Sequence, residues 1–221
     1  MIYIDGICEK AVQLVKEPVF AGLTTNPTII KRDRPGWGMM DAMKFLSKVP
    51  GERHFVQGSI LSGNWVQKVR EFLKKSDFDP ELFTIKLPWD PQKASAIVPE
   101  LNEMGVGVCA TAVYTVQQYY AALSMEVEYV AVYYDRMIKA GIDAEERIEE
   151  MLEVGGWHSS APHIIAASIK DIESANLLLA LGVHDLTLPV DIAGEYIMGS
   201  FPADDLNRFE GDFKQIGRAH V

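Results

Sequence analysis

The chain has 221 residues, 48% of them hydrophobic and 24% charged, with 31 acidic residues against 21 basic ones. No apolar run approaches the roughly 20 residues needed to cross a bilayer, which excludes a membrane-spanning protein. The formal charge of −10 argues against binding to the backbone of nucleic acid, and two cysteines, Cys8 and Cys109, are too few for a disulfide framework or a cysteine-based metal site.

The first element is a short apolar strand that begins almost at once, in the segment MIYIDGICEK. This segment lacks the basic start and the long apolar stretch of a secretory signal, so we expect a soluble, cytoplasmic protein.

Short β-type runs then alternate with stretches of helical periodicity along the chain. The eight predicted strands are Ile2–Asp5, Val19–Thr24, His54–Gly58, Leu82–Leu87, Gly107–Ala112, Tyr129–Tyr133, His163–Ser168 and Asp185–Leu188. The clearest helical patterns between them are Gly63–Lys75, Pro91–Met104, Val116–Met125, Ala144–Glu153 and Ile172–Leu181.

Strict alternation of strands and helices predicts a parallel sheet with right-handed crossovers. Eight units in about 200 residues favour an α/β fold of the (β/α)8 (TIM) barrel type, and an open sheet with fewer strands is the alternative. Residues 1–221 would form a single barrel domain, with 200–221 as a C-terminal helical tail. The apolar tail residues Phe201, Leu206, Phe209 and Phe213 would pack on the barrel or on a neighbouring subunit.

In such barrels the chemistry lies at the carboxyl ends of the strands. Seven predicted strands end in or near a polar residue, and all seven side chains would face one mouth: Asp5, Thr24, Gln57, Lys86, Thr111, Tyr133 and Ser168.

The most informative of these is Lys86, which interrupts the apolar run Leu82–Pro88. Lysine is seldom fully buried, so this amine would either extend into solvent, pair with a carboxylate such as Asp5, or lie in a dry site that favours its neutral form. A neutral amine is a nucleophile that can add to a ketone and form an imine, and the imine draws electrons from the adjacent carbon–carbon bond. That is class I aldolase chemistry, which requires neither a metal nor an organic cofactor.

Several motifs in one order resemble the small transaldolase family over almost the entire chain, and most closely its fructose-6-phosphate aldolases. They are Gly22-Leu23-Thr24-Thr25-Asn26-Pro27-Thr28, Lys86-Leu87-Pro88, Ala110-Thr111-Ala112-Val113-Tyr114, Tyr129-Val130-Ala131-Val132-Tyr133 and Ala166-Ala167-Ser168. The resemblance implies a (β/α)8 enzyme in which Lys86 forms an imine with a dihydroxyacetone unit. It also implies that the small-molecule substrate is a sugar phosphate and that the protein is a homo-oligomer, a pentamer or decamer.

The resemblance also assigns roles to other residues. Asp5 and Asn26 would line the site and bind substrate hydroxyls, with Thr24 nearby, while Thr111 and Gln57 would hold the water used in proton transfer. From the residues alone, Asp5 equally suits a helix cap and Thr111 a β-branched strand residue.

Gln57 and Tyr133 distinguish two activities within the family. Transaldolases, which pass the three-carbon unit to an aldose phosphate, usually carry glutamate and phenylalanine at these positions. The pair found here resembles the aldolases, which release dihydroxyacetone, because the Tyr133 hydroxyl can carry a proton together with water. Tyr134 is adjacent, and since side chains alternate along a strand only one of the two faces inward.

The substrate phosphate would bind at Arg136, Ser168 and Lys170, near the positive end of the next helix. Departures from the family pattern are Ala110 for glycine, Val132 for proline, and Trp89-Asp90, where a tryptophan near the mouth would alter specificity. The five histidines show no metal-binding spacing. Two further interpretations remain: a transaldolase, and a barrel that binds phosphosugars without turning them over.

Overall fold

Eight parallel strands close into a barrel in the order β1 to β8, and β8 pairs with β1, in the computed structural model. The structure describes residues 1–61, 64–75, 79–198 and 203–216. The strands are β1 (Ile2–Asp5), β2 (Phe20–Thr24), β3 (His54–Gln57), β4 (Phe83–Pro88), β5 (Gly107–Val113), β6 (Tyr129–Tyr133), β7 (His163–Ala167) and β8 (Asp185–Pro189). The predicted (β/α)8 barrel is confirmed, and each strand boundary differs from its prediction by at most one residue.

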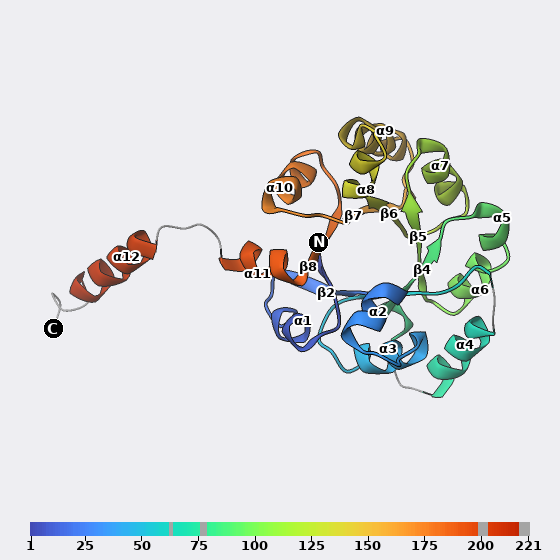
Figure 1. Cartoon of the computed structure of the whole chain (residues 1–221), viewed down its shortest axis with the longest axis horizontal. Coiled ribbons are helices and arrows are strands. Elements are labelled where there is room, and N and C mark those ends of the chain that lie inside the picture. The colour runs from blue at the N-terminus through green and yellow to red at the C-terminus, as the bar shows by residue number, and fades with distance from the viewer. Residues whose placement is uncertain (62–63, 76–78, 199–202, 217–221) are drawn as a thin grey trace.

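Helices surround the strands, as Figure 1 shows. They are α1 (Glu9–Leu14), α2 (Pro27–Asp33), α3 (Met39–Leu46), α4 (Trp65–Lys75), the 3-10 turn η1 (Pro80–Leu82), α5 (Pro91–Ala94), α6 (Val98–Glu103), α7 (Val116–Ser124), α8 (Tyr134–Lys139), α9 (Ala144–Gly156), α10 (Ile172–Ala180), α11 (Val190–Met198) and α12 (Ala203–Ile216). Of these described helices, none is both long and apolar enough to cross a membrane.

One predicted helix, Pro91–Met104, is wrong as a continuous element because it divides into α5 and α6. Pro99 stands in the first turn of α6, where its missing N–H costs nothing. Within a single long helix, residue 99 would need a backbone N–H to donate to the carbonyl of Ser95. Proline has no such N–H, and its ring would clash with that carbonyl.

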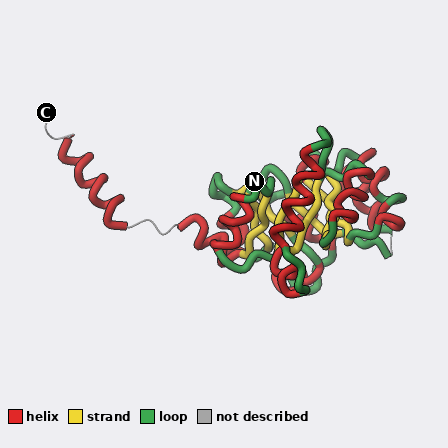
Figure 2. The backbone as a smooth tube through the Cα atoms, turned by 90° about the horizontal axis from the view of Figure 1, so that it is seen from above, coloured by secondary structure: helices red, strands yellow, loops and turns green. Residues whose placement is uncertain are grey.

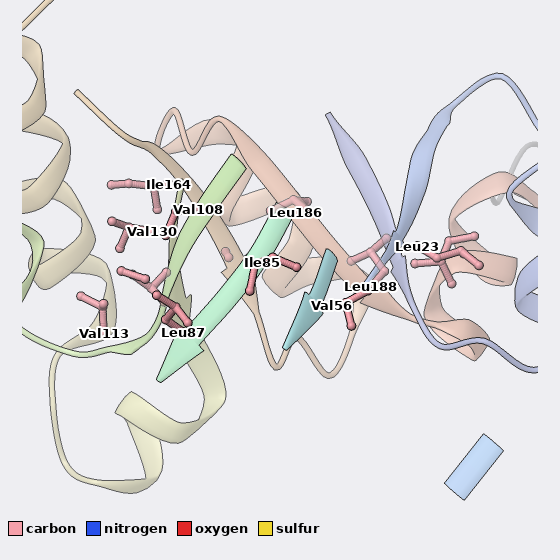
Figure 3. Packing of buried hydrophobic residues seen from close by; sticks show 14 of the residues in the cluster. Leu23, Val56, Ile85, Leu87, Val108, Val113, Val130, Ile164, Leu186 and Leu188 are labelled. Carbon is pink, nitrogen blue, oxygen red and sulfur yellow. The ribbon is translucent and has the colours of Figure 1, made fainter. Parts of the chain in front are cut away.

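Along each strand, side chains point alternately outward, to the helices, and inward, to the centre of the barrel. Outward-facing strand residues pack against the helices in one large cluster, part of which Figure 3 shows. A smaller cluster fills the barrel interior and consists of Tyr3, Ala21, Phe55, Cys109, Tyr129, Ala131 and Ile165. Its aromatic rings meet edge to face, with centroids 5.0 Å apart for Tyr3 and Phe55 and for Phe55 and Tyr129. This packed interior closes the centre of the barrel, so a ligand would bind at the ends of the strands.

The junction between β2 and β3 has the shortest register in the barrel, because Thr24 and Phe55 form its one aligned pair. His54 closes this junction: its Nδ1 accepts the backbone N–H of Leu23 at 3.1 Å, and its Nε2 lies 3.2 Å from the carbonyl oxygen of Val49. The ring is fully buried. Since Nδ1 is an acceptor, the proton of the neutral ring is on Nε2.

We therefore predict a pH-dependent stability. Burial lowers the pKa of His54 from 6.5 to about 4, so between these values the unfolded chain binds a proton that the folded chain excludes. Stability is fully present above about pH 6.5 and falls as the pH drops towards 4, by up to about 3 kcal/mol. Urea unfolding measured across this pH range checks the prediction.

The matched variants are His54→Gln, whose amide oxygen can still accept the Leu23 N–H, and His158→Gln at an exposed position. We expect the first to flatten the pH dependence and the second to leave it unchanged. His184 also has a pKa lowered by burial, so the difference between wild type and His54→Gln isolates the contribution of His54. An unchanged slope in His54→Gln would contradict the assignment.

The C-terminal tail carries an exposed apolar stripe. Leu206, Phe209, Phe213 and Ile216 recur at helical spacing on α12, and all four are exposed. Figures 1 and 2 show α12 away from the barrel, so the predicted packing on the barrel is not observed, and contact with a neighbouring subunit stays a prediction. Parts of the predictions, Gly63, Phe201, 200–202 and 217–221, lie outside the described residues.

Candidate active site

A pocket of about 550 Å³ opens at the carboxyl ends of the strands. Nine of the ten predicted site residues line it: Asp5, Asn26, Gln57, Lys86, Thr111, Tyr133, Arg136, Ser168 and Lys170. The tenth, Thr24, does not line the pocket. Residues from across the sequence are thus brought together because each ends, or closely follows, a parallel strand.

Lys86 lies at the base of this pocket, above the packed interior. Its Cα is paired with that of Gln57 on β3 and that of Cys109 on β5. The residue is only 3% exposed, so the amine does not extend into solvent. None of the ion pairs between described residues involves Lys86, which leaves the amine without a carboxylate within 4 Å in that part of the chain.

Asp5 is a pocket residue and not a helix cap, because the N-cap of α1 is Cys8. Its Oδ1 accepts a hydrogen bond from Thr24 Oγ1 at 2.8 Å, and this hydroxyl lies 2.6 Å from Thr187 Oγ1. Burial raises the pKa of Asp5, and the opposing effects of the Lys86 charge and the Thr24 hydroxyl do not cancel it. Thr24, predicted as a substrate-binding residue, instead lies beneath Asp5 and holds its carboxyl.

The inward-facing tyrosine is Tyr133. Its hydroxyl oxygen accepts a hydrogen bond from Thr111 Oγ1 at 3.1 Å, so its own proton can point into the pocket. Tyr134 faces away from the pocket and donates to Glu145 at 3.1 Å. Next to Thr111, Ala112 has a φ of 62° where the β5–β6 register shifts, a bulge that ends regular pairing at the rim of the pocket.

The predicted phosphate residues lie together on one side of the mouth. The Arg136 guanidinium lies over the Tyr133 ring, 4.5 Å from its centroid, and Ser168 adopts a φ of 64°. The first amides of α10 are less available than predicted, since Asp171 caps this helix by accepting from the Ser174 N–H at 2.7 Å. An anion would therefore depend on the side chains of Arg136, Ser168 and Lys170.

The expectation that Trp89 lies at the mouth needs revision. Trp89 is buried in the core, and its indole N–H donates to the carbonyl of Gln118 at 3.0 Å, so the ring does not line the pocket. Asp90 caps α5 by accepting from the Lys93 N–H. Asn26 caps α2 through its Oδ1, which leaves its NH₂ group free to donate to a ligand.

The charge of the pocket is opposite to that of the chain. Four cationic side chains line the pocket, Arg32, Lys86, Arg136 and Lys170, against the single carboxyl of Asp5. Arg32 was not predicted from the sequence. A protein of net charge −10 thus concentrates positive charge where an anionic ligand would enter.

The arrangement supports nucleophilic chemistry by an amine. It combines a buried lysine, a carboxyl of raised pKa and a hydroxyl pair within one cationic pocket. Cys109 is not a competing nucleophile, because burial raises the pKa of its thiol to about 12 and keeps it protonated.

Comparison with known proteins finds a relative that is similar in sequence and solved structures that share the fold. The chain is similar to a protein of Streptococcus pneumoniae named "Probable fructose-6-phosphate aldolase", with 30% identity over 173 residues, 78% of this chain and 77% of that protein. Three solved structures share the fold at 12% to 14% identity. The Xanthomonas citri FimX EAL domain in complex with c-diGMP matches with a TM-score of 0.56, over 71% of this chain and 69% of that chain. A cube-shaped protein cage designed by fusing symmetric oligomeric domains matches with a TM-score of 0.55, over 97% of this chain and 76% of that chain. The structure titled "Native KDPGal structure" matches with a TM-score of 0.51, over 85% of this chain and 80% of that chain.

The family model for transaldolase/fructose-6-phosphate aldolase matches residues 64–217. This range includes Lys86, Thr111, Tyr133 and the residues that follow β6 and β7. The chain therefore belongs to the transaldolase/fructose-6-phosphate aldolase family.

Proposed function

We propose that this enzyme is a class I aldolase that cleaves fructose 6-phosphate reversibly to dihydroxyacetone and glyceraldehyde 3-phosphate. The observation that carries the proposal is Lys86, a buried lysine at the base of a cationic pocket. Membership of the family and the name of the Streptococcus pneumoniae relative support the choice of substrate.

In the proposed reaction, the neutral amine of Lys86 adds to C2 of the ketose, and water leaves to form the imine. A base takes the proton of the C4 hydroxyl as the C3–C4 bond breaks, and the bonding electrons move into the imine to give an enamine. The aldehyde departs as glyceraldehyde 3-phosphate. Protonation of the enamine at C3 and addition of water to the imine then release dihydroxyacetone and restore Lys86.

Asp5 is the best-placed base for the C4 hydroxyl. Its raised pKa makes its carboxylate a stronger proton acceptor than an exposed aspartate, and Thr24 fixes its orientation. Asn26 can donate its NH₂ group to a substrate hydroxyl, since its oxygen is already occupied by the helix cap.

The proton for imine formation and hydrolysis would pass through Tyr133 and a water held by Thr111 and Gln57. Thr111 donates to the Tyr133 oxygen, which directs the phenolic proton elsewhere, and the pocket is the open direction. Gln57 is paired with Lys86 across β3 and β4, and both side chains line the pocket. The phosphate would bind to Arg136, Ser168 and Lys170 at the other side of the mouth.

The competing activity is transaldolase, in which the enamine waits for an acceptor aldehyde. We expect the wild-type enzyme to release glyceraldehyde 3-phosphate from fructose 6-phosphate without an acceptor, at a rate similar to that with erythrose 4-phosphate added. A coupled assay with and without erythrose 4-phosphate measures this. Release that depends on the acceptor would make the enzyme a transaldolase, and no ligand-dependent chemistry at all would favour a phosphosugar-binding barrel.

Tyr133→Phe sharpens the same assay, because it removes the hydroxyl and keeps the ring under Arg136. We expect release of dihydroxyacetone to slow by about 10- to 100-fold, and transfer to erythrose 4-phosphate to slow less. Tyr134→Phe, which removes a hydroxyl directed at Glu145, is the matched control. Equal losses of both activities in Tyr133→Phe would contradict a selective role in release.

A further inference from the structure

A pair of buried threonines lies beneath Asp5, on the two strands that flank β1. Thr24 belongs to β2 and Thr187 to β8, and their hydroxyl oxygens are 2.6 Å apart. Each residue is at most 2% exposed. Inward-facing residues of alternate strands share one layer of a (β/α)8 barrel, and β8 and β2 are the alternate strands on either side of β1. The two hydroxyls therefore meet inside the barrel, across β1.

The threonine pair lies at the boundary between the packed interior and the pocket. Along β1, Tyr3 is paired with Thr187 and Asp5 with Thr24. Tyr3 belongs to the interior cluster, whereas Asp5 lines the pocket. Valine has nearly the shape of threonine and would fill the same space, whereas a buried hydroxyl costs free energy unless it is hydrogen-bonded. The two hydroxyls at this boundary therefore indicate a role beyond packing.

The hydrogen bonds of the pair run in one direction. An ionised carboxylate only accepts, so Thr24 donates its single hydroxyl hydrogen to Asp5 Oδ1, at 2.8 Å. The contact between the two hydroxyls then requires the hydrogen of Thr187, which donates to the Thr24 oxygen. This gives a series of hydrogen bonds from Thr187 through Thr24 to Asp5, in which each bond polarises and strengthens the next. Among the described residues no other hydrogen bond reaches the Asp5 carboxyl, so its Oδ2 is left for a ligand.

Charged side chains act on Asp5 without fixing its orientation. Burial raises the pKa of Asp5, and the charge of Lys86 on β4 and the hydrogen bond from Thr24 lower it. Arg32 and Asp33, neighbours in α2, act in opposite directions, since the arginine lowers this pKa and the aspartate raises it. None of the ion pairs between described residues includes Asp5. The direction of the carboxylate therefore depends on the hydroxyls beneath it.

We propose that Thr187 is a positioning residue for the base of the reaction, because its hydroxyl acts through Thr24 to hold the Asp5 carboxylate with Oδ2 towards the C4 hydroxyl. The inference rests on the proposed function, in which Asp5 accepts the C4 proton as the C3–C4 bond breaks. Thr187 does not line the pocket, so it acts only through Thr24. When Oδ2 takes the proton, Oδ1 keeps its hydrogen bond, and the series of hydroxyls does not rearrange during the reaction.

The test compares cleavage of fructose 6-phosphate by the wild type, Thr187→Val, Thr187→Ser and Thr84→Val, with kcat and KM measured from neutral to acidic pH. Thr187→Val keeps the shape and removes the hydroxyl, so Thr24 holds the Asp5 carboxylate less firmly. We expect kcat to fall about 2- to 10-fold, the usual effect of one hydrogen bond, with a smaller change in KM. The acid limb of kcat should move to higher pH, because a weaker hydrogen bond stabilises the carboxylate less.

Two variants control for packing. Thr187→Ser restores the hydroxyl without the methyl group and should keep the wild-type acid limb. Thr84→Val should change neither kcat nor the acid limb, because Thr84 is also a fully buried strand residue but its hydroxyl lies 3.5 Å from Arg53 Nη1, which precedes β3 at the opposite end of the barrel. Where Thr187→Val does not fold, Thr187→Ala makes the same comparison with Thr187→Ser.

The outcomes separate the two proposals. If the wild type cleaves fructose 6-phosphate, and Thr187→Val keeps the wild-type kcat and acid limb or Thr187→Ser changes them equally, the inference about Thr187 is overturned and the proposed function stands. If the wild type does not cleave this sugar, or if Asp5→Asn keeps the wild-type rate, the proposed reaction is overturned and the role of Thr187 with it. A merely structural role for Thr187 predicts lower stability with an unmoved acid limb, so the pH profile distinguishes positioning from folding.

Discussion

Replacement of Lys86 by alanine or methionine is expected to abolish cleavage of fructose 6-phosphate, with a loss on the order of 10⁴-fold or more in kcat. Cys109, which is paired with Lys86 across β4 and β5, cannot take its place, because burial raises the pKa of its thiol and keeps it protonated. Lys86→Met is the better-matched variant, since its flexible apolar side chain fills most of the volume and leaves no buried amine. Its free energy of unfolding should not fall below that of the wild type.

Borohydride reduction identifies the intermediate directly. Treatment in the presence of fructose 6-phosphate should add one reduced three-carbon unit to the wild-type chain, and peptide mass spectrometry should locate it on Lys86. Lys93→Ala is the matched control, because Lys93 belongs to the same βα unit but is half-exposed and paired with Asp90 at 2.8 Å. An adduct on another lysine, or cleavage that persists in Lys86→Met, would contradict an imine mechanism at Lys86.

The barrel could be predicted from the sequence because its strands carry strong local signals. Each is a short, largely apolar run, and the carboxyl ends of parallel strands meet at one mouth of a barrel, so the polar residues at those ends are expected to lie together. For that reason the order of the strands alone predicts that Asp5, Gln57, Lys86 and Thr111 share one site. The family resemblance added their roles.

The bounds of the helices and the directions of individual side chains are harder to predict, since they depend on contacts between distant segments. Nothing local distinguishes Tyr133 from Tyr134, and only the closed barrel places Tyr133 inside and Tyr134 against Glu145. Trp89 follows β4 directly, yet its indole turns outward because the carbonyl of Gln118, in α7, offers its N–H a partner. The break between α5 and α6 had a visible signal in Pro99.

Arg32 illustrates what pattern alone misses. The segment Lys31-Arg32-Asp33-Arg34 has the composition of an ordinary solvated helix end, where charged residues face water. Only the fold reveals that Asp33 turns inward to the Ile7 amide and carries the Arg32 guanidinium towards the pocket. The contact between the buried Asp33 carboxylate and the Arg32 guanidinium depends on tertiary structure, so no periodic pattern in the sequence indicates it.

Asp5→Asn is expected to lower kcat for fructose 6-phosphate cleavage by about 10²- to 10⁴-fold, the usual contribution of a positioned general base. The substitution preserves shape and retains an oxygen that can accept from Thr24, so the loss would reflect the missing proton acceptor. In the wild type, activity should fall at acidic pH with an apparent pKa above the ordinary aspartate value of 3.8, because burial favours the protonated carboxyl. Asp143→Asn, at a carboxylate outside the pocket lining that caps α9, should keep that acid limb.

Asp5→Asn should also raise the free energy of unfolding. This measurement of stability separates an effect on catalysis from an effect on folding. A carboxyl whose pKa is raised in the folded chain is ionised at a cost at neutral pH, since burial outweighs the attraction of Lys86 and the Thr24 hydrogen bond. Its contribution to stability is therefore lost as the pH rises above 3.8, and an uncharged amide avoids that loss. Urea unfolding at neutral pH should show a higher free energy of unfolding for Asp5→Asn than for wild type. If the variant loses stability together with activity, Asp5 holds the fold at this position and another group must accept the C4 proton.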